Sequence, residues 1–325
     1  MRENELLSVE DLVVKYFLRR STVEAVNGVS FTIDKGERVG LVGETGAGKT
    51  TTALSILDLV PNPPGRIVSG KIVLNGENLR EKDINYIRKV RGNDVAMIFQ
   101  DPMTSLNPVI TVGDQILEVI QLHNELSRTE AMNRAGEMLE LVGIPRDRYP
   151  EYPHQFSGGM KQRVLIAMAL ACQPKLLIAD EPTSALDVTI QAQVLELING
   201  LRERMGMSLL LITHDLGVVA ETCDRVMIMY AGSIVESGTV RKVYKNIQHP
   251  YTQGLFDSIP RLDVETDRLK PIKGMMPDPS NLPAGCAFAE RCPWATEECR
   301  TTKPELREIE EGHSVACFNP IGKEA

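Results

Sequence analysis

Residues 43–50, "GETGAGKT", combine three glycines with a lysine and a threonine in the pattern G-x-x-x-x-G-K-[ST]. The strand-like run "ERVGLVG" precedes them, and the helical pattern "TTALSILDLV" follows. Glycines let successive backbone N–H groups turn toward an anion, and the N-terminus of a helix favours negative charge. The pattern predicts a phosphate-binding loop in which Lys49 reaches the β- and γ-phosphates of a nucleotide and Thr50 offers its hydroxyl to Mg²⁺.

A second chemical group ends the apolar run "KLLIADEP" at residues 175–182. Asp180 could hold the hydration shell of Mg²⁺, and Glu181 could polarise an attacking water. Two acidic residues after a strand could instead cap a helix in solvent, because helix starts favour negative charge. The phosphate loop elsewhere in the chain favours the catalytic interpretation.

A third motif, "FSGGMKQR" at residues 156–163, precedes an apolar helical pattern. Ser157 can cap that helix, so Gly158 and Gly159 open a second helix start suited to an anion. The motif stands before "KLLIADEP", and "SALD" and "LLLITHD" follow it. With the phosphate loop, this set strongly resembles the ATP-binding cassette (ABC) ATPases over residues 5 to 240.

The resemblance implies roles for residues that match the family's motifs. Glu181 is expected to be the general base, His214 the histidine that contacts the γ-phosphate, and Gln100 the glutamine that links the Mg²⁺ site to the helical subdomain. The catalytic set is Glu181, His214, Lys49 and Gln100, and the Mg²⁺ set is Thr50, Gln100 and Asp180.

Nucleotide contacts are implied on two surfaces. A ring that stacks on adenine and the phosphate loop with its flank supply the first: Tyr16, Gly43, Glu44, Thr45, Gly46, Ala47, Gly48, Lys49, Thr50 and Thr51. Phe17 is the other ring available. A second subunit's signature residues, Ser157, Gly158, Gly159 and Gln162, are expected to close the site. Communication across the dimer is assigned to Ser184, Ala185, Leu186 and Asp187.

Composition and pattern set the fold expected for these motifs. The 325 residues include 44 acidic and 36 basic side chains, a formal charge of −8, which gives no reason to expect a nucleic-acid partner. Apolar strand runs alternate with helical patterns, which favours a mostly parallel sheet. The resemblance implies an α/β P-loop NTPase core with an antiparallel β subdomain, a helical subdomain inserted at about 101–155, and a small C-terminal cysteine-rich module. The predicted domains are 1–240 and 241–325.

The sequence narrows the resemblance further. "FQDPMTSLNPVITVGDQILE", "HPYTQGLFDSIP" and "GHSVACF" closely resemble the ATPase subunits of dipeptide and oligopeptide importers. This implies integral membrane permease subunits as partners, a second ATPase subunit that is related or identical, and indirectly an extracytoplasmic solute-binding protein. No secretory signal or membrane-spanning run is recognised, so we expect a peripheral protein on the cytoplasmic face of the membrane. The alternatives are a soluble, non-transport cassette ATPase and an ATPase with a redox or metal-sensing role.

Four of the six cysteines, Cys286, Cys292, Cys299 and Cys317, cluster near the C-terminus with the spacing C-x5-C-x6-C-x17-C. This spacing leaves zinc, an iron–sulfur cluster and four free thiols open. Resemblance to the peptide-importer ATPases implies a [4Fe–4S] cluster, with Zn²⁺ as the alternative. We expect the metal to be structural, holding together a tail too small to build a core. Cys172 and Cys223 are expected to be small buried hydrophobes.

Overall fold

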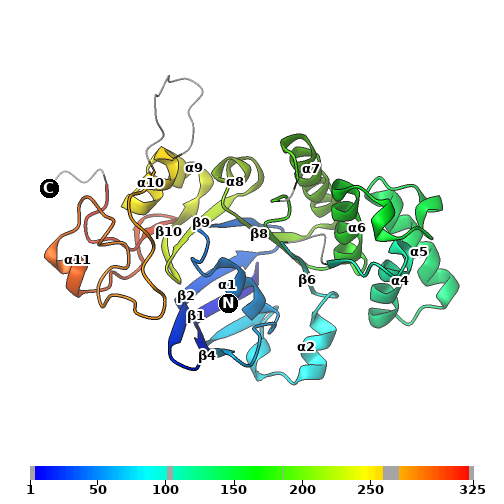
Figure 1. Cartoon of the computed structure of the whole chain (residues 1–325), viewed down its shortest axis with the longest axis horizontal. Helices are drawn as coiled ribbons and strands as arrows, with labels where there is room; N and C mark the ends of the chain where they lie inside the picture. Colours follow the sequence, from blue (N-terminus) through cyan, green and yellow to red (C-terminus); the bar gives the residue numbers. More distant parts are fainter. Residues whose placement is uncertain (1–3, 101–104, 185, 259–270, 322–325) are drawn as a thin grey trace. The chain divides into compact units, whose positions relative to one another are not determined.

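The computed structural model describes residues 4–100, 105–184, 186–258 and 271–321 (Figure 1). The chain forms two compact units. The first comprises Met1–Leu6, Ile33–Arg38 and Leu79–Ile212, and the second comprises Leu7–Thr32, Val39–Asn78 and Thr213–Ala325. The boundary predicted near residue 240 falls inside the second unit. None of the helices in the described residues is long and apolar enough to cross a membrane.

An antiparallel sheet occupies the N-terminal part of the second unit. Its strands run in the order β2-β1-β4-β5, with bounds Thr22–Asp34, Glu5–Phe17, Gly65–Leu74 and Glu77–Asn78. β1 pairs with β4, so that Leu7 lies opposite Leu74. Alternating buried residues such as Leu12 and Val14 give the sheet one core face. The predicted antiparallel subdomain is confirmed.

Parallel and antiparallel strands combine in the rest of the second unit. β3 (Arg38–Val42) pairs in parallel with β9 (Arg225–Tyr230), and β9 pairs antiparallel with β10 (Ser233–Thr239). The C-terminal extension adds β12 (His313–Val315) to β10 and β11 (Arg307–Glu310) to β12. The extension, which the sequence predicted as a small cysteine-rich module, therefore continues this sheet. The helices of this unit are α1 (Lys49–Ile56), α8 (Leu216–Thr222), α9 (Val240–Lys245), α10 (Pro250–Asp257) and α11 (Glu297–Thr301).

Three parallel strands form the sheet of the first unit. β7 (Leu176–Asp180) pairs with both β6 (Val95–Ile98) and β8 (Ser208–Thr213). Every residue of β7 and β8 is buried, as expected for parallel strands that are covered on both faces. Outside the helical insertion, this unit also contains η1 (Leu79–Glu81), α2 (Ile84–Val90) and α7 (Val188–Met205).

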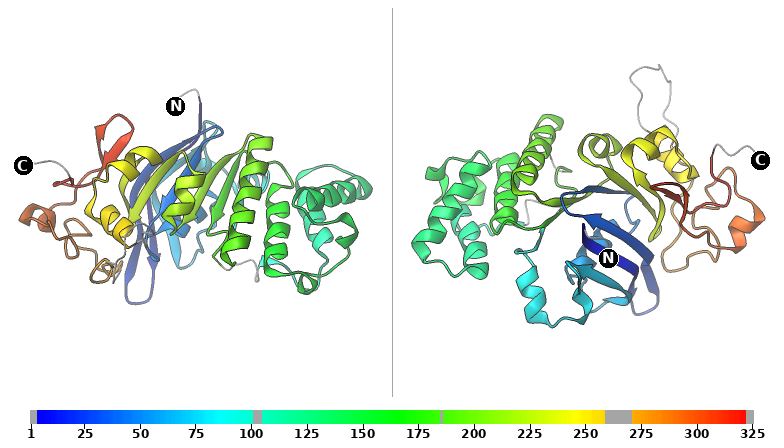
Figure 2. Two further views of the ribbon diagram at one scale, coloured as in Figure 1. Left: turned by 90° about the horizontal axis from the view of Figure 1, so that it is seen from above. Right: turned by 180° about the vertical axis from the view of Figure 1, so that it is seen from behind.

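A helical subdomain is inserted between β6 and β7. It contains α4 (Val112–His123), α5 (Arg128–Leu141), η2 (Arg146–Arg148), η3 (Pro153–Gln155) and α6 (Gly158–Leu170). Ser127 starts α5 with a capping box: its hydroxyl accepts from the Glu130 N–H at 3.3 Å, and the Glu130 carboxylate accepts from the Ser127 N–H at 2.9 Å. α4, α5 and α6 lie side by side (Figure 2). The predicted helical insertion is confirmed in the described residues.

A buried ion pair joins the extension to the sheet. His313 on β12 and Glu236 on β10 are both fully buried, with His313 Nε2 2.8 Å from Glu236 Oε1. The same carboxylate accepts from the backbone N–H groups of Gln248 and His249, each at 2.9 Å. Burial lowers the pKa of His313, but hydrogen bonds and charges of Glu236 and Glu310 outweigh burial and raise this pKa above the ordinary 6.5.

We expect His313→Gln to lower the free energy of unfolding by about 3 kcal/mol in mild acid, because it leaves Glu236 buried without its cation. The raised pKa means that this stabilisation is complete below the unfolded-state value of 6.5 and is lost as pH rises through the folded-state value. Urea unfolding of the wild type and the variant should therefore give a difference in the free energy of unfolding that is largest below about pH 6.5 and narrows as the pH rises above it. His154→Gln, at an exposed position, is the control. A difference in the free energy of unfolding that does not change with pH would contradict the pairing of a protonated His313 with Glu236.

Candidate functional site

The predicted phosphate loop lies between β3 and α1 and needs glycine at two positions. A Cβ atom on Gly43 would lie 2.2 Å from the carbonyl oxygen of Met229, and one on Gly48 would lie 2.4 Å from that of Ala25. Gly48 also has a φ of 104°, which side chains other than glycine rarely adopt. At Gly43 and Gly48 the backbone of this loop therefore packs against neighbouring carbonyl groups with no room for a side chain.

Lys49 begins α1 and lies inside the loop. Its side chain is nearly buried, and its ammonium group donates to the carbonyl of Gly43 at 2.7 Å and to that of Glu44 at 3.1 Å. The neighbouring residues Thr45, Gly46 and Thr50 are exposed. A cation held by carbonyl dipoles at the start of a helix is well placed to receive phosphate oxygens.

Glu44 has partners that the sequence did not predict. Its carboxylate pairs with Arg291, with the closest approach at 2.8 Å, and its N–H donates to the hydroxyl of Tyr251 at 2.9 Å. Both partners lie more than 200 residues away along the chain. No local pattern could have revealed them, because the contacts depend on how the extension packs in this unit.

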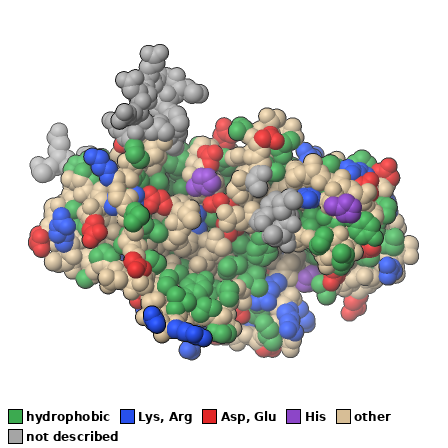
Figure 3. Space-filling view, viewed as in Figure 1, with side chains coloured by type: hydrophobic (Ala, Val, Ile, Leu, Met, Phe, Trp, Pro, Cys, Tyr) green, Lys and Arg blue, Asp and Glu red, His purple; other side chains and the backbone are tan. Residues whose placement is uncertain are grey.

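Tyr16 lies next to the helix that follows the loop. Its hydroxyl is 3.4 Å from Thr51 Oγ1, and its ring packs so closely on Gly65 that a Cβ there would approach it to 2.8 Å. Phe17, Leu18 and Val68 are about half exposed, and hydrophobic side chains gather over this end of the sheet (Figure 3). Such a surface suits the flat face of a nucleotide base.

In the first unit, the structure brings Gln100 and Glu181 together. Gln100 Nε2 donates to Glu181 Oε2 at 2.9 Å, directly after β7 ends at the buried Asp180. Glu181 has a φ of 44°, an uncommon value for a residue with a side chain. Its backbone N–H donates to the carbonyl of Ile212 at 2.8 Å. Strain of this kind often marks a functional position.

The signature residues lie at the start of α6. Ser157 and Gly158 are exposed, and Ser157 caps the helix by accepting from the Met160 N–H at 3.4 Å. Gly159 needs to be small, because a Cβ there would lie 2.7 Å from Ile190. Gln162 is fully buried, and its amide has no hydrogen-bond partner among the described residues.

The remaining predicted positions lie at helix starts. Asp187 caps α7 by accepting from the Ile190 N–H at 3.0 Å, and the hydroxyl of Ser184 donates to the Glu181 carbonyl at 3.2 Å. Leu186 lies between them, whereas Ala185 lies outside the described residues. In the second unit His214 is exposed and stands just before Asp215, which caps α8.

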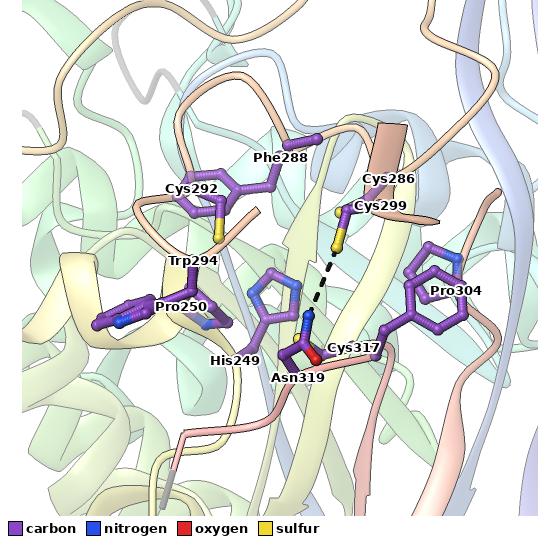
Figure 4. Close-up of a pocket in the computed structure, with 12 residues that line it drawn as sticks. His249, Pro250, Cys286, Phe288, Cys292, Trp294, Cys299, Pro304, Cys317 and Asn319 are labelled. Carbon is purple, nitrogen blue, oxygen red and sulfur yellow. Dashed lines mark hydrogen bonds between the residues drawn. The ribbon is translucent and has the colours of Figure 1, made fainter. Parts of the chain in front are cut away.

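All four clustered cysteines line one pocket of the second unit, with a cavity of about 10 Å³ (Figure 4). Cys286 and Cys292 come from one loop, Cys299 from α11 and Cys317 from the segment after β12. Burial and then the nearby thiols raise the pKa of Cys317 to about 11. Trp294 and His249 are among the other residues that line this pocket.

The sulfur atoms do not form a ready-made ligand set. In the described part of the chain, no group of three or more His, Cys, Asp or Glu side chains is arranged to hold a metal ion. The hydroxyl of Thr296 lies 3.3 Å from the sulfur of Cys299, and the Asn319 amide donates to that sulfur at 3.9 Å. The four clustered cysteines therefore line one pocket, but the described side chains are not arranged to hold a metal ion.

Among the other thiols, Cys223 is buried as expected. Cys172 is half-buried, its S–H donates to the Val119 carbonyl at 3.8 Å, and burial raises its pKa.

We expect Gly48→Ala to weaken binding of a fluorescent ATP analogue by at least about tenfold, because the left-handed conformation and the clash with Ala25 each oppose a side chain. Gly200→Ala is the matched control, since Gly200 lies in α7 with open space around its Cβ position. That variant should keep wild-type affinity and gain about 1 kcal/mol of stability. Equal affinity of the two variants would refute the assignment of the loop.

The amino-acid sequence of this chain is similar to those of known proteins. Residues 26–184 match the family described as "ABC transporter", and residues 235–299 match "Oligopeptide/dipeptide transporter, C-terminal region". The chain is 53% identical to the oligopeptide transport ATP-binding protein AppD of Bacillus subtilis, covering 96% of each chain. It is 48% identical to the dipeptide transport ATP-binding protein DppD of the same species, covering 97% of this chain and 94% of the relative.

Solved structures agree on the fold. A dimeric ATP-binding cassette in a post-hydrolysis state, bound to ADP and Pi, is similar with a TM-score of 0.65 at 26% identity, covering 73% of this chain and 99% of that one. The family predicted from "GETGAGKT", "FSGGMKQR" and "KLLIADEP" is confirmed. The chain belongs to the ABC transporter ATPases, and it carries the C-terminal region of the oligopeptide and dipeptide transporters.

Proposed function

We propose that the chain is the ATP-binding and ATP-hydrolysing subunit of a membrane importer for dipeptides, oligopeptides or related solutes. The observation that carries the proposal is the phosphate loop with Lys49 held inside it. The loop occurs in a chain that is about half identical, over nearly its whole length, to relatives named as peptide transport ATP-binding proteins. These relatives also favour transport over a soluble, non-transport ATPase.

The residues of the proposed ATP site have separate tasks. Lys49 and the N–H groups at the start of α1 bind the phosphates, and Tyr16 stacks on the adenine. Thr50, Gln100 and Asp180 offer the oxygen ligands that Mg²⁺ prefers, and the ion would neutralise charge on the phosphates. Gln100 uses its amide nitrogen on Glu181, which leaves the amide oxygen for the cation.

Hydrolysis is assigned to Glu181 and His214. Glu181 accepts a proton from the attacking water, while the Gln100 amide orients its carboxylate. His214 directly follows β8 and would contact the γ-phosphate of bound ATP. The unusual backbone conformation of Glu181 is consistent with a side chain that must point in one fixed direction.

We expect Glu181→Gln to lower the rate of ATP hydrolysis by about 10² to 10⁴-fold and to leave ATP affinity nearly unchanged, because it removes the proton acceptor and no phosphate ligand. A phosphate-release assay and equilibrium ATP binding measure the two effects. Glu196→Gln, at an exposed position of α7, is the control. Hydrolysis at the wild-type rate by the Glu181 variant would eliminate this residue as the base.

Assembly follows from the two nucleotide surfaces. We propose that the signature residues of one subunit, the exposed Ser157 and Gly158 with Gly159, close on ATP bound to the phosphate loop of a second, related or identical ATPase. Similarity to a dimeric cassette supports this arrangement. The helical subdomain would dock the permease subunits at the cytoplasmic face of the membrane, and an extracytoplasmic solute-binding protein would deliver the solute.

A [4Fe–4S] cluster in the cysteine pocket, with Zn²⁺ as the alternative, stays part of the proposal. Four thiols around one pocket suit either group, which would hold Cys286, Cys292, Cys299 and Cys317 together. The cavity holds about one water molecule, so the sulfur atoms would have to move outward to admit a cluster. Because burial raises the pKa of Cys286, Cys292 and Cys317, metal binding to these thiols would release protons.

Anaerobic purification tests the cluster. We expect about four iron atoms and four sulfides per chain with broad visible absorption, and we expect Cys299→Ser to lose most of the iron. Cys172→Ser, outside the pocket, is the matched control. Full occupancy by zinc without iron, or four free thiols, would refute the cluster.

A further inference from the structure

The carboxylate of Glu44, the second residue of the phosphate loop, is held by the C-terminal extension. Arg291 Nη1 donates to Glu44 Oε2 at 2.8 Å, and Arg291 Nη2 donates to Glu44 Oε1 at 3.0 Å. This is a bidentate pair, the arrangement in which arginine binds carboxylates most strongly. The Arg291 side chain is 6% exposed and that of Glu44 is 29% exposed, so solvent screens the pair only in part.

Arg291 is itself fixed from several sides. Its Nε donates to the Lys273 carbonyl at 3.1 Å, and Nη1 also donates to the Tyr230 hydroxyl at 3.2 Å. Its guanidinium carbon lies 5.7 Å from the ring centre of Tyr230 and 5.8 Å from that of Phe288. The guanidinium group therefore presents its paired donors to Glu44 from a rigid base. Lysine could supply the charge but not this geometry.

The backbone of Glu44 is anchored on the same aromatic cluster. Its N–H donates to the hydroxyl of Tyr251, which is fully buried with its ring centre 4.6 Å from that of Tyr230. Burial raises the pKa of this hydroxyl, which keeps it neutral. The carbonyl of Glu44 accepts from the Lys49 ammonium group. Glu44 thus connects the extension directly to the lysine of the phosphate loop.

Charge gives the pair a further consequence. A carboxylate in a phosphate-binding loop repels the phosphates of ATP, and Arg291 offsets that charge. We infer that Arg291 is a positioning residue for ATP, which acts through Glu44 to hold the phosphate loop in its binding conformation and to neutralise the loop's own acidic side chain. The inference rests on the proposed function. It makes the cysteine-rich extension a working part of the nucleotide site.

Equilibrium ATP binding and steady-state hydrolysis by the full chain test this role. We expect Arg291→Gln to weaken ATP binding and raise KM by about tenfold, because Glu44 is left charged and unanchored, while kcat at saturating ATP changes by less than about twofold. Glu44→Gln should weaken binding less, because it removes the repulsive charge along with the anchor. Arg300→Gln, at an exposed position of α11 in the same extension, should match the wild type.

The double variant separates positioning from general stability. If Arg291 acts through Glu44, then Arg291→Gln should add no further loss of ATP affinity in a Glu44→Gln background. Independent, additive losses in the double variant would overturn the inference, as would wild-type affinity for Arg291→Gln. If that variant does not fold, Arg291→Lys replaces it: lysine keeps the charge but cannot make the paired contact, so wild-type affinity for Arg291→Lys would overturn the positioning role. A wild-type chain that does not bind ATP would instead refute the proposed function.

Discussion

A phosphate-binding loop must turn its backbone toward the ligand, and this requirement removes the side chains that would otherwise hold it in place. In this protein Gly43 packs against the carbonyl of Met229, and Gly48 packs against that of Ala25. The loop is therefore shaped by neighbouring strands and by its one acidic side chain, Glu44. Arg291 and Tyr251 of the extension contact the loop through the carboxylate and the backbone N–H of Glu44.

Much of the fold and site follows from local patterns. The apolar runs that form β7 and β8, the helix starting at Lys49 and the helical insertion are all visible in the sequence, because each depends on residues close together in the chain. Gln100 and Glu181 were assigned to one catalytic set only by family resemblance, because 81 residues separate the two, and their hydrogen bond was not predicted. Physical pattern alone could not have paired them.

The features that the sequence did not predict depend largely on contacts between distant residues. β11 and β12 contain four and three residues, too few for an alternating pattern to indicate strands, so neither strand was predicted. β12 pairs with the edge of β10, and the local sequence of β12 gives no indication of this partner. The role of Arg291 was likewise not predicted, because its partner Glu44 lies 247 residues away along the chain. The burial of Gln162 was missed because its motif suggested a surface role.

The pairing of β10 with β12 has a consequence for truncated forms of this protein. A chain shortened at residue 240 would keep β10 but lose the strand that covers its edge and the histidine that neutralises Glu236. An open strand edge pairs readily with other chains, and a buried carboxylate without a cation favours local opening. Such a fragment would retain every motif of the cassette and still be prone to aggregate.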